Sequence, residues 1–337
     1  MDLLAERVAK QPLTPEVMRE VMERLVSGAM PPEEIRAFLQ GLASRGETAE
    51  EIAAATEVLR AHAVKLPLSR PLELCDTCGT GGDGQGTVNI STLAALVASA
   101  AGVRVVKHGN RAASSRCGSA DLLEALGVNL LASPAQVVRC LDEVGFGFCF
   151  APQFHPAMRV VAPVRKALGI RTIFNLVGPL ANPAPLAFQL VGVSEARWLR
   201  PMAEALVKLG VRHGLVVHGE DGLDEVTTTG PTAILEVRAA GAITEGRLDP
   251  ATLGLPRATL DALRGGDAQH NARMARACLA GAPSAIQDVV VLNAGCAIYV
   301  ADQARTIQEG LAKAREALVS GRTAQVLERV RELTHAG

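Results

Sequence analysis

The residues best suited to chemistry lie in one glycine-rich segment, which begins near Cys75 and ends at Gly86. Between positions 79 and 86, five of the eight residues are glycine and one is aspartate. An apolar run precedes this segment, and residues 89–92 follow it as the capped start of a helix. Glycine lets the backbone approach a ligand closely, and a helix N-terminus presents unpaired N–H groups and a positive dipole. Strand, glycine-rich loop and helix in this order are typical of an anion-binding site.

The kind of anion depends on the residues that come after the glycine-rich segment. Gly79, Gly81 and Gly84 match the G-x-G-x-x-G pattern of dinucleotide sites, but such sites carry an acidic residue at the end of the next strand. Here the next apolar run, 103–106, ends in the basic sequence 107–110 (Lys-His-Gly-Asn). The Gly-Lys-Ser/Thr sequence that closes a P-loop is absent as well. Both nucleotide-binding motifs are therefore disfavoured.

A second loop, 107–119, repeats the arrangement at the end of the following strand. It carries Lys107, Arg111 and Arg116 with several hydroxyl groups, and it leads into a helix expected to begin at Ser119. Because ligands of such sheets bind at the carboxyl ends of the strands, we expect the two loops to converge there. Several cations and N–H donors at one place suit a ligand with more than one phosphate.

Three short amphipathic helices are expected before these loops, within residues 1 to about 64. Thr14-Pro15 and Pro31-Pro32 mark the beginnings of two of them, and Thr48 with Glu51 forms a capping box for the third. From Leu72 onward, short apolar runs alternate with alanine-rich helical stretches. The runs expected to be strands are 72–75, 103–106, 147–150, 214–217 and 289–292, and the helical stretches include 91–101 and 120–126. This alternation predicts an α/β fold, with a small N-terminal helical domain plus a large domain whose mostly parallel sheet is covered by helices.

One connection, residues 152–185, interrupts the alternation and contains six of the 18 prolines. We expect it to leave the sheet, pack on the N-terminal helices and return. A cleft between the two units would then be the default ligand site.

Composition narrows the class of protein further. A chain of 337 residues, 48% of them hydrophobic, is long enough for two domains and too apolar to be disordered. A formal net charge of −1 leaves no basic excess for a nucleic acid. No run of 18 apolar residues is present, and the opening residues lack the apolar stretch of a signal peptide. Seven cysteines, an odd number, do not make a disulfide framework, and Cys75 with Cys78 lacks the partners of a zinc site. We expect a cytoplasmic protein that binds neither nucleic acid nor a membrane.

The chain resembles the anthranilate phosphoribosyltransferase family in a series of motifs that keep the family's order and spacing to about residue 330. The motifs are Gly79–Asp83, Asn89–Thr92, Lys107–Asn110, Gly118–Asp121, His155–Arg159, Arg165, Gly178–Leu180, Asn182–Pro183 and Leu223–Glu225. The resemblance implies transfer of the 5-phosphoribosyl group from phosphoribosyl pyrophosphate to the amine of anthranilate, giving N-(5-phosphoribosyl)anthranilate and pyrophosphate. This reaction is the second step of tryptophan synthesis from chorismate, and it depends on magnesium.

The resemblance also implies roles for individual residues. The donor-binding residues would be Gly79, Gly82, Asp83, Thr87, Asn89, Ile90, Ser91, Thr92, Lys107, His108, Gly109, Asn110, Arg111, Ala112, Ala113, Ser114, Ser115 and Ser119. Anthranilate would lie against Gly79, Asn110 and Arg165, and magnesium against Ser91, Asp224 and Glu225. No residue is assigned as a general acid or base, because an aromatic amine is already neutral at pH 7 and positioning should carry much of the rate. His108 and His155 would only line the pocket.

The resemblance further implies a homodimer and a division of the chain. Residues 1–68, joined by part of 152–185, would form the helical domain, and residues 69–337 the domain that binds the donor. Two alternatives stay open. Pyrimidine nucleoside phosphorylases share this architecture and a similar glycine-rich loop, although Asp83 and the 107–110 sequence fit the transferase better. Some relatives of the transferase bind nucleic acid without activity, although the near-neutral charge and the intact Asp224-Glu225 pair argue against that here.

Overall fold

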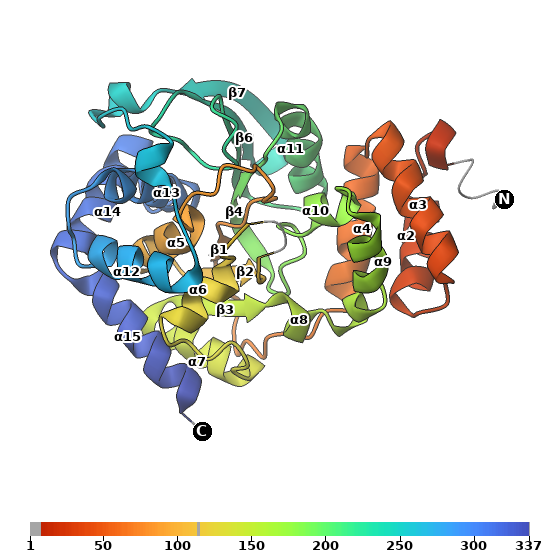
Figure 1. Cartoon of the computed structure of the whole chain (residues 1–337), viewed down its shortest axis with the longest axis horizontal. Coiled ribbons are helices and arrows are strands. Elements are labelled where there is room, and N and C mark those ends of the chain that lie inside the picture. The colour runs from red at the N-terminus through yellow and green to blue at the C-terminus, as the bar shows by residue number, and fades with distance from the viewer. Residues whose placement is uncertain (1–7, 113–114, 337) are drawn as a thin grey trace.

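The computed structural model describes residues 8–112 and 115–336 of the chain. After a helical stretch at residues 8–10, the helices α2 (Pro15–Val26), α3 (Pro32–Arg45) and α4 (Ala49–Ala61) form one end of the molecule (Figure 1). Each begins where the sequence indicates. Thr14 Oγ1 accepts a hydrogen bond from Val17 N at 3.4 Å, and Thr48 and Glu51 form the reciprocal capping box. The capping expectations for this part of the chain are confirmed.

A single seven-stranded sheet forms the centre of the α/β domain. Its strands are β1 (Leu74–Asp76), β2 (Val105–Gly109), β3 (Phe146–Phe150), β4 (Leu186–Gly192), β5 (His213–Gly219), β6 (Thr232–Arg238) and β7 (Ala242–Leu248). They lie in the order β3-β2-β1-β4-β5-β6-β7. The pairs from β3 through β5 are parallel, and β6 and β7 are antiparallel additions at one edge. The predicted fold class is therefore confirmed.

Four of the five runs expected to be strands form β1, β2, β3 and β5, with shifted ends. The fifth run, 289–292, lies inside α13 (Ala285–Val300), so that prediction is wrong. Almost every residue of α13 is buried, and a helix buried on all sides has no polar period that distinguishes its core from a buried strand. The strands β4, β6 and β7 have no counterpart among the expected runs.

Helices cover both faces of the sheet. The remaining ones are α5 (Ile90–Ala100), α6 (Ser119–Ala125), α7 (Pro134–Val144), α8 (Ala151–Phe154), α9 (Ala162–Leu168), α10 (Ile173–Val177), α11 (Leu199–Lys208), α12 (Ala268–Leu279), α14 (Ile307–Val319) and α15 (Arg322–His335). Neighbouring strand residues point to opposite faces. Leu215 thus belongs to the core beneath α5 and α13, while Val216 belongs to the core shared with α11 and the N-terminal helices.

The connection after β3 contains the short helices α8, α9 and α10. Val161, Val164 and Phe174 of this connection are buried in the same hydrophobic cluster as Phe38 and Leu39 of α3. In Figure 1 α9 and α10 accordingly stand beside α4, away from the helices α12 to α15. This packing brings the connection across the carboxyl edge of the sheet.

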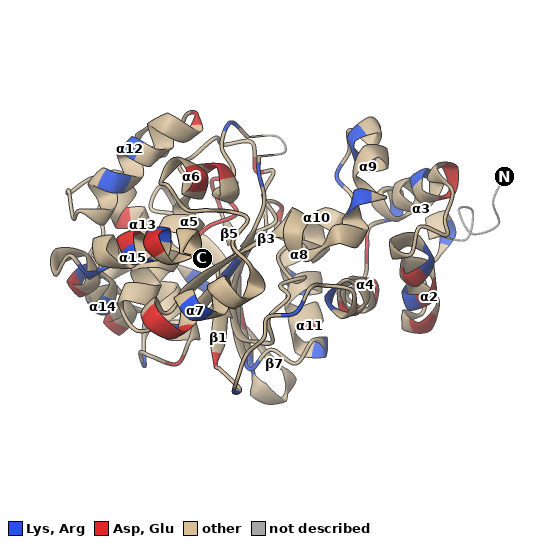
Figure 2. Ribbon diagram, turned by 90° about the horizontal axis from the view of Figure 1, so that it is seen from below, with Lys and Arg blue, Asp and Glu red and all other residues tan. Residues whose placement is uncertain are grey.

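Basic and acidic residues are interspersed along the helices (Figure 2). Many of them form exposed ion pairs, such as Arg24 with Glu34 and Arg329 with Glu143. Within residues 8–112 and 115–336, no helix combines the length and apolar character needed to cross a bilayer.

Candidate active site

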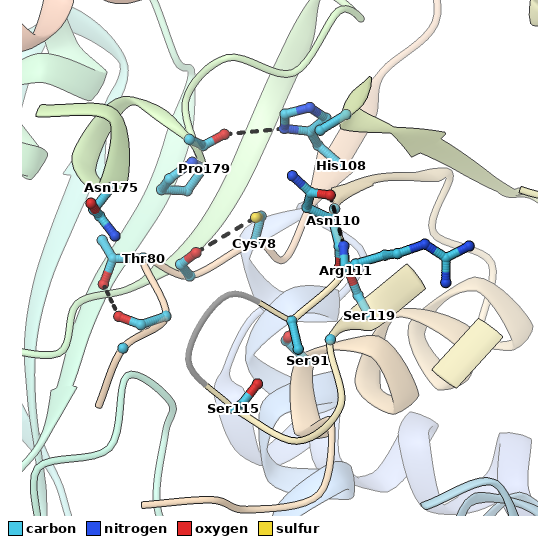
Figure 3. A pocket seen from close by; sticks show the side chains of 18 of the residues that line it. Cys78, Thr80, Ser91, His108, Asn110, Arg111, Ser115, Ser119, Asn175 and Pro179 are labelled. Atoms are coloured by element: carbon cyan, nitrogen blue, oxygen red, sulfur yellow. Dashed lines mark hydrogen bonds between the residues drawn. The ribbon is translucent and has the colours of Figure 1, made fainter. Parts of the chain in front are cut away.

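One cavity of about 550 Å³ lies where the loops after β1, β2 and β5 meet the connection that carries α8 to α10. Every residue implied for donor, anthranilate or magnesium binding lines this cavity, except Ala113 and Ser114, which lie outside the described residues. Figure 3 shows side chains from both loops and from the connection around the same space. The expectation that the two loops converge at the carboxyl edge is confirmed.

The glycine-rich loop is held by backbone contacts that leave little room for a side chain. Thr80 N donates to Gly192 O at 2.9 Å, and Gly81 N donates to Asp224 Oδ2 at 2.6 Å. A Cβ at Gly79 would lie 2.6 Å from the same carboxylate oxygen, so a larger residue there would displace Asp224. Gly81 has a φ of +65°, a left-handed conformation that favours glycine. The glycines are therefore required by close approach and by backbone conformation.

Asp224 and Glu225 reach the cavity from the loop after β5. The main chain of the next residue, Val226, is fixed by Asn293 of α13, whose Oδ1 accepts from Val226 N at 3.0 Å and whose Nδ2 donates to Val226 O at 2.7 Å. Glu225 Oε1 accepts from Ser91 N at 3.0 Å. The structure thus joins Ser91 and Glu225, which are 134 residues apart, at the start of α5.

The electrostatics of this pair follow from burial and crowding. Desolvation and the nearby Asp83 carboxylate raise the pKa of Asp224, and desolvation and the Asp224 carboxylate raise the pKa of Glu225. Ionised oxygens held this close repel one another, and a bound divalent cation relieves the repulsion.

The start of α5 differs from the expected cap in one respect. Asn89 occupies the N-cap position, but its side chain makes no capping hydrogen bond. Its Nδ2 donates to Cys117 O at 2.9 Å, which ties the glycine-rich loop to the second loop. The carboxylate of Glu225 binds an N–H of the first turn instead, and a negative charge there is favoured by the helix dipole.

Lys107 brings a buried cation to the floor of the cavity. The side chain is only 2% exposed, and its Nζ donates to Thr77 O at 3.2 Å and Ser91 Oγ at 3.3 Å. Behind it, the fully buried Asp76 accepts from Asn182 Nδ2 at 2.8 Å. Desolvation raises the pKa of Asp76 to about 6, against the opposing effect of the Lys107 charge.

The two arginines of the second loop do not present their charge as expected. Arg111 lines the cavity, but its guanidinium is paired with Asp121 at 3.0 Å and Glu124 at 2.7 Å. These two carboxylates raise the pKa of Arg111. Arg116 is exposed and is not among the lining residues, so the expectation that it joins the cations of the site is wrong. The position of a cation in a loop sequence does not fix the direction of its side chain.

Arg165 of α9 faces the cavity from the opposite side of the cleft. Its guanidinium lies 5.2 Å from the ring centre of Phe174, and burial lowers the pKa of Arg165. Across the described part of the chain, no carboxylate pairs with it. The cation is therefore available to an anionic group of a ligand.

Two buried histidines also line the cavity. The rings of His108 and His155 are 5.1 Å apart, edge to face. Desolvation lowers the pKa of His108 to about 3 and that of His155 to about 4. His108 Nδ1 lies 3.1 Å from Gly178 O (Figure 3), and because a carbonyl only accepts, Nδ1 carries the proton and Nε2 is left as an acceptor.

Several residues that line the cavity carry no role in the site as predicted from the sequence, although most of them fall within its motifs. They include Cys78, Thr80, Arg159, Asn175 and Pro179; Figure 3 labels Cys78, Thr80, Asn175 and Pro179. The proline-rich connection signalled only that the chain leaves the sheet. Which of its side chains reach the cavity depends on the packing of α9 and α10.

Comparison with known proteins places this site in a family. Residues 72–324 match the model of the α/β domain of a glycosyl transferase family, and residues 1–63 match the model of its helical bundle domain. Anthranilate phosphoribosyltransferase of Roseiflexus castenholzii is 48% identical over 330 residues, which cover 98% of this chain and 96% of the relative.

Two solved structures carry the comparison into three dimensions. The crystal structure of anthranilate phosphoribosyltransferase from Thermus thermophilus has 48% identity and a TM-score of 0.93 over 100% of both chains. The enzyme from Saccharomyces cerevisiae in complex with PRPP and Mg has 30% identity and a TM-score of 0.82, over 90% of this chain and 85% of the yeast chain. The chain belongs to the anthranilate phosphoribosyltransferase family.

Proposed function

We propose that this chain transfers the 5-phosphoribosyl group from phosphoribosyl pyrophosphate to the amine of anthranilate, releasing pyrophosphate, in the second step of tryptophan synthesis. The observation that carries the proposal is the composition of one cavity. The loops of the α/β domain contribute N–H groups, Lys107 and a carboxylate pair, and α9 contributes the guanidinium of Arg165, which pairs with no carboxylate among the described residues. One cavity therefore contains both groups suited to the phosphates of the donor and a cation suited to the carboxylate of the acceptor.

The donor is assigned to the two loops, with the residues implied by the resemblance. Departure of pyrophosphate leaves positive charge on the ribose ring and negative charge on the leaving group. The residues of the two loops and the buried cation of Lys107 line the cavity in fixed positions, so we assign to them the stabilisation of that negative charge. Ser119 Oγ, which donates to Asn110 O at 3.3 Å, holds the two ends of the second loop together.

Magnesium is assigned to Ser91, Asp224 and Glu225. The donor set fits this ion, because Mg²⁺ is usually held by one or two carboxylates together with phosphate oxygens and water. Asp224 Oδ2 and Glu225 Oε1 accept from main-chain N–H groups, which leaves the second oxygen of each carboxylate for the ion. When bound, Mg²⁺ supplies neutralisation of the charge that builds on pyrophosphate.

Anthranilate is assigned to Arg165, Asn110 and the main chain at Gly79. The planar guanidinium of Arg165 matches the two oxygens of a carboxylate. The amine is neutral at pH 7 and attacks without a strong base, so the task of the site is to hold it against the ribose carbon. The neutral state of His108 and His155 agrees with a site that needs no charged acid or base.

We also propose the remaining features that the resemblance implies. Residues 1–68 with part of 152–185 form the helical domain, and residues 69–337 form the donor-binding domain. The buried cluster shared by α2 to α4, α9 and α10 supports this division. The family resemblance supports a cytoplasmic homodimer, whose mass sedimentation equilibrium would measure.

The loss of anthranilate fluorescence tests the proposed reaction directly. Purified protein should quench the fluorescence only when both phosphoribosyl pyrophosphate and magnesium are added. No loss under those conditions, together with a mobility shift of DNA, would instead favour the non-catalytic nucleic-acid-binding alternative. Release of pentose phosphate from a pyrimidine nucleoside and phosphate would favour the phosphorylase.

A further inference from the structure

The side chain of Arg171, which does not line the cavity, is hydrogen-bonded to the main chain of the glycine-rich loop. Arg171 lies in the short link between α9 and α10, and its Nη1 donates to two main-chain carbonyl oxygens, Gly81 O and Gly82 O, each at 3.3 Å. Arg171 is not among the residues that line the cavity. Its Nε lies 3.8 Å from Glu195 Oε1, and its Nη2 is buried without a hydrogen-bond partner in the described structure.

The contact with Arg171 also sets the direction of two N–H groups of the loop. In a trans peptide the N–H and the C=O point in opposite directions. The carbonyl of Gly81 shares a peptide group with the N–H of Gly82, and the carbonyl of Gly82 shares one with the N–H of Asp83. Drawing both carbonyls towards Arg171 therefore turns both N–H groups away from it.

These two N–H groups are unused in the structure. Neither Gly82 N nor Asp83 N donates a hydrogen bond to any described residue, and both residues line the cavity. Gly82 has a φ of +75°, and a Cβ there would lie 2.8 Å from Arg171 Nη1. Neighbouring anchors hold the loop elsewhere, through Gly81 N on Asp224 and Gln85 Nε2 on Asp221 O. Arg171 is thus the described side chain that fixes the two peptide groups between those anchors.

We propose that Arg171 is a positioning residue for the pyrophosphate of the donor, which acts through the glycine-rich loop without touching the ligand. This inference rests on the proposed function. A pyrophosphate repels carbonyl oxygens and attracts N–H groups. Fixing the orientation of two adjacent peptide groups should therefore strengthen the binding of pyrophosphate more than one ordinary loop contact does. Five residues, 166–170, separate Arg171 from Arg165 of α9. The same short connection therefore supports the donor loop and carries the guanidinium assigned to anthranilate.

Three variants test the proposal. Arg171→Gln removes the charge, Arg171→Lys keeps it, and Arg197→Gln removes the neighbouring arginine that binds Glu195 at 2.9 Å without touching the loop. Titration calorimetry with magnesium pyrophosphate gives binding without turnover, and steady-state kinetics give the KM of each substrate. Thermal unfolding of each variant shows whether the fold is kept.

We expect Arg171→Gln to weaken pyrophosphate binding roughly 10- to 100-fold, since it removes charge-assisted hydrogen bonds that orient the loop. The KM for phosphoribosyl pyrophosphate should rise by a similar factor, while the KM for anthranilate changes less than about twofold. Arg171→Lys should recover most of the affinity, and Arg197→Gln should match the wild type.

Other results would overturn the proposal. Unchanged pyrophosphate affinity in Arg171→Gln would show that the loop holds its orientation without the arginine. Tighter binding would show that Arg171 holds the loop in a position that competes with the ligand. An equal loss of pyrophosphate affinity in Arg197→Gln would show that the effect comes from the general surface charge and not from the contact with the loop. If the wild type bound pyrophosphate through Arg171 but did not consume anthranilate, the proposed function would fail while the positioning role stood.

Discussion

Replacing Arg165 by alanine should separate the acceptor site from the donor site. The guanidinium has the face of Phe174 on one side and no carboxylate partner in the described structure, so its charge is not already neutralised by the protein. The side chain is partly buried, and this burial lowers the pKa of Arg165. A ligand carboxylate that pairs with it gains a charge-assisted contact whose loss costs about 1.5–3 kcal/mol.

That free energy corresponds to a change of about 10- to 150-fold in the KM for anthranilate. The KM for phosphoribosyl pyrophosphate should stay close to that of the wild type, because the donor loops are anchored by contacts that do not involve Arg165. Arg165→Lys should fall between the two, since an ammonium keeps the charge but not the planar fork.

Initial rates from anthranilate fluorescence, with each substrate varied in turn, measure both constants. Lys166→Ala is a matched control, because the next residue of α9 is exposed and does not line the cavity. A rise in the KM of the donor with an unchanged KM for anthranilate would refute the assignment and place Arg165 at the phosphates. A change of similar size in Lys166→Ala would show that the effect comes from α9 as a whole.

The carboxylates, the loop packing and the buried histidine give three further expectations. The double variant Asp224→Asn, Glu225→Gln should need more than about ten times as much magnesium for half-maximal activity, and added magnesium should recover part of the rate. A depressed maximal rate at an unchanged magnesium requirement would contradict the metal assignment. Gly192→Ala should lower the free energy of unfolding, measured in urea, by about 3 kcal/mol, because the new Cβ would lie 1.6 Å from Asp224 O. The control Gly246→Ala, with open space around the new Cβ, should leave the free energy of unfolding unchanged. Equal stability of the two variants would disprove the packing argument. Burial lowers the pKa of His108 from 6.5 to about 3, so the unfolded chain binds a proton that the folded chain does not, and stability falls as the pH drops below 6.5. Between pH 8 and pH 5 the melting temperature of His108→Gln should therefore fall less than that of the wild type. An equal fall in the two proteins would refute the buried neutral state.

Signals that act over a few residues were readable from the sequence. The capping residues Thr14 and Thr48 start their helices as expected, and the glycine-rich loop lies between a strand and a helix as expected. These features depend on one turn of backbone or on the conformational freedom of glycine, so neighbouring residues suffice to specify them. The family resemblance predicted most of the residues that line the cavity, including Asp224 and Glu225.

Other features exist only because distant segments pack together. The run 289–292 was misassigned as a strand, yet the helix that contains it supplies Asn293, which fixes the main chain beside Glu225. Arg116 is exposed and does not line the cavity, whereas Arg171 binds the loop carbonyls across 90 residues of sequence. The sequence by itself determined the fold class through the alternation of apolar runs and helical stretches, and it determined the glycine-rich loop and the family through short motifs. Tertiary structure decided which charged side chains face the cavity, since their directions depend on long-range contacts and burial that no local pattern encodes.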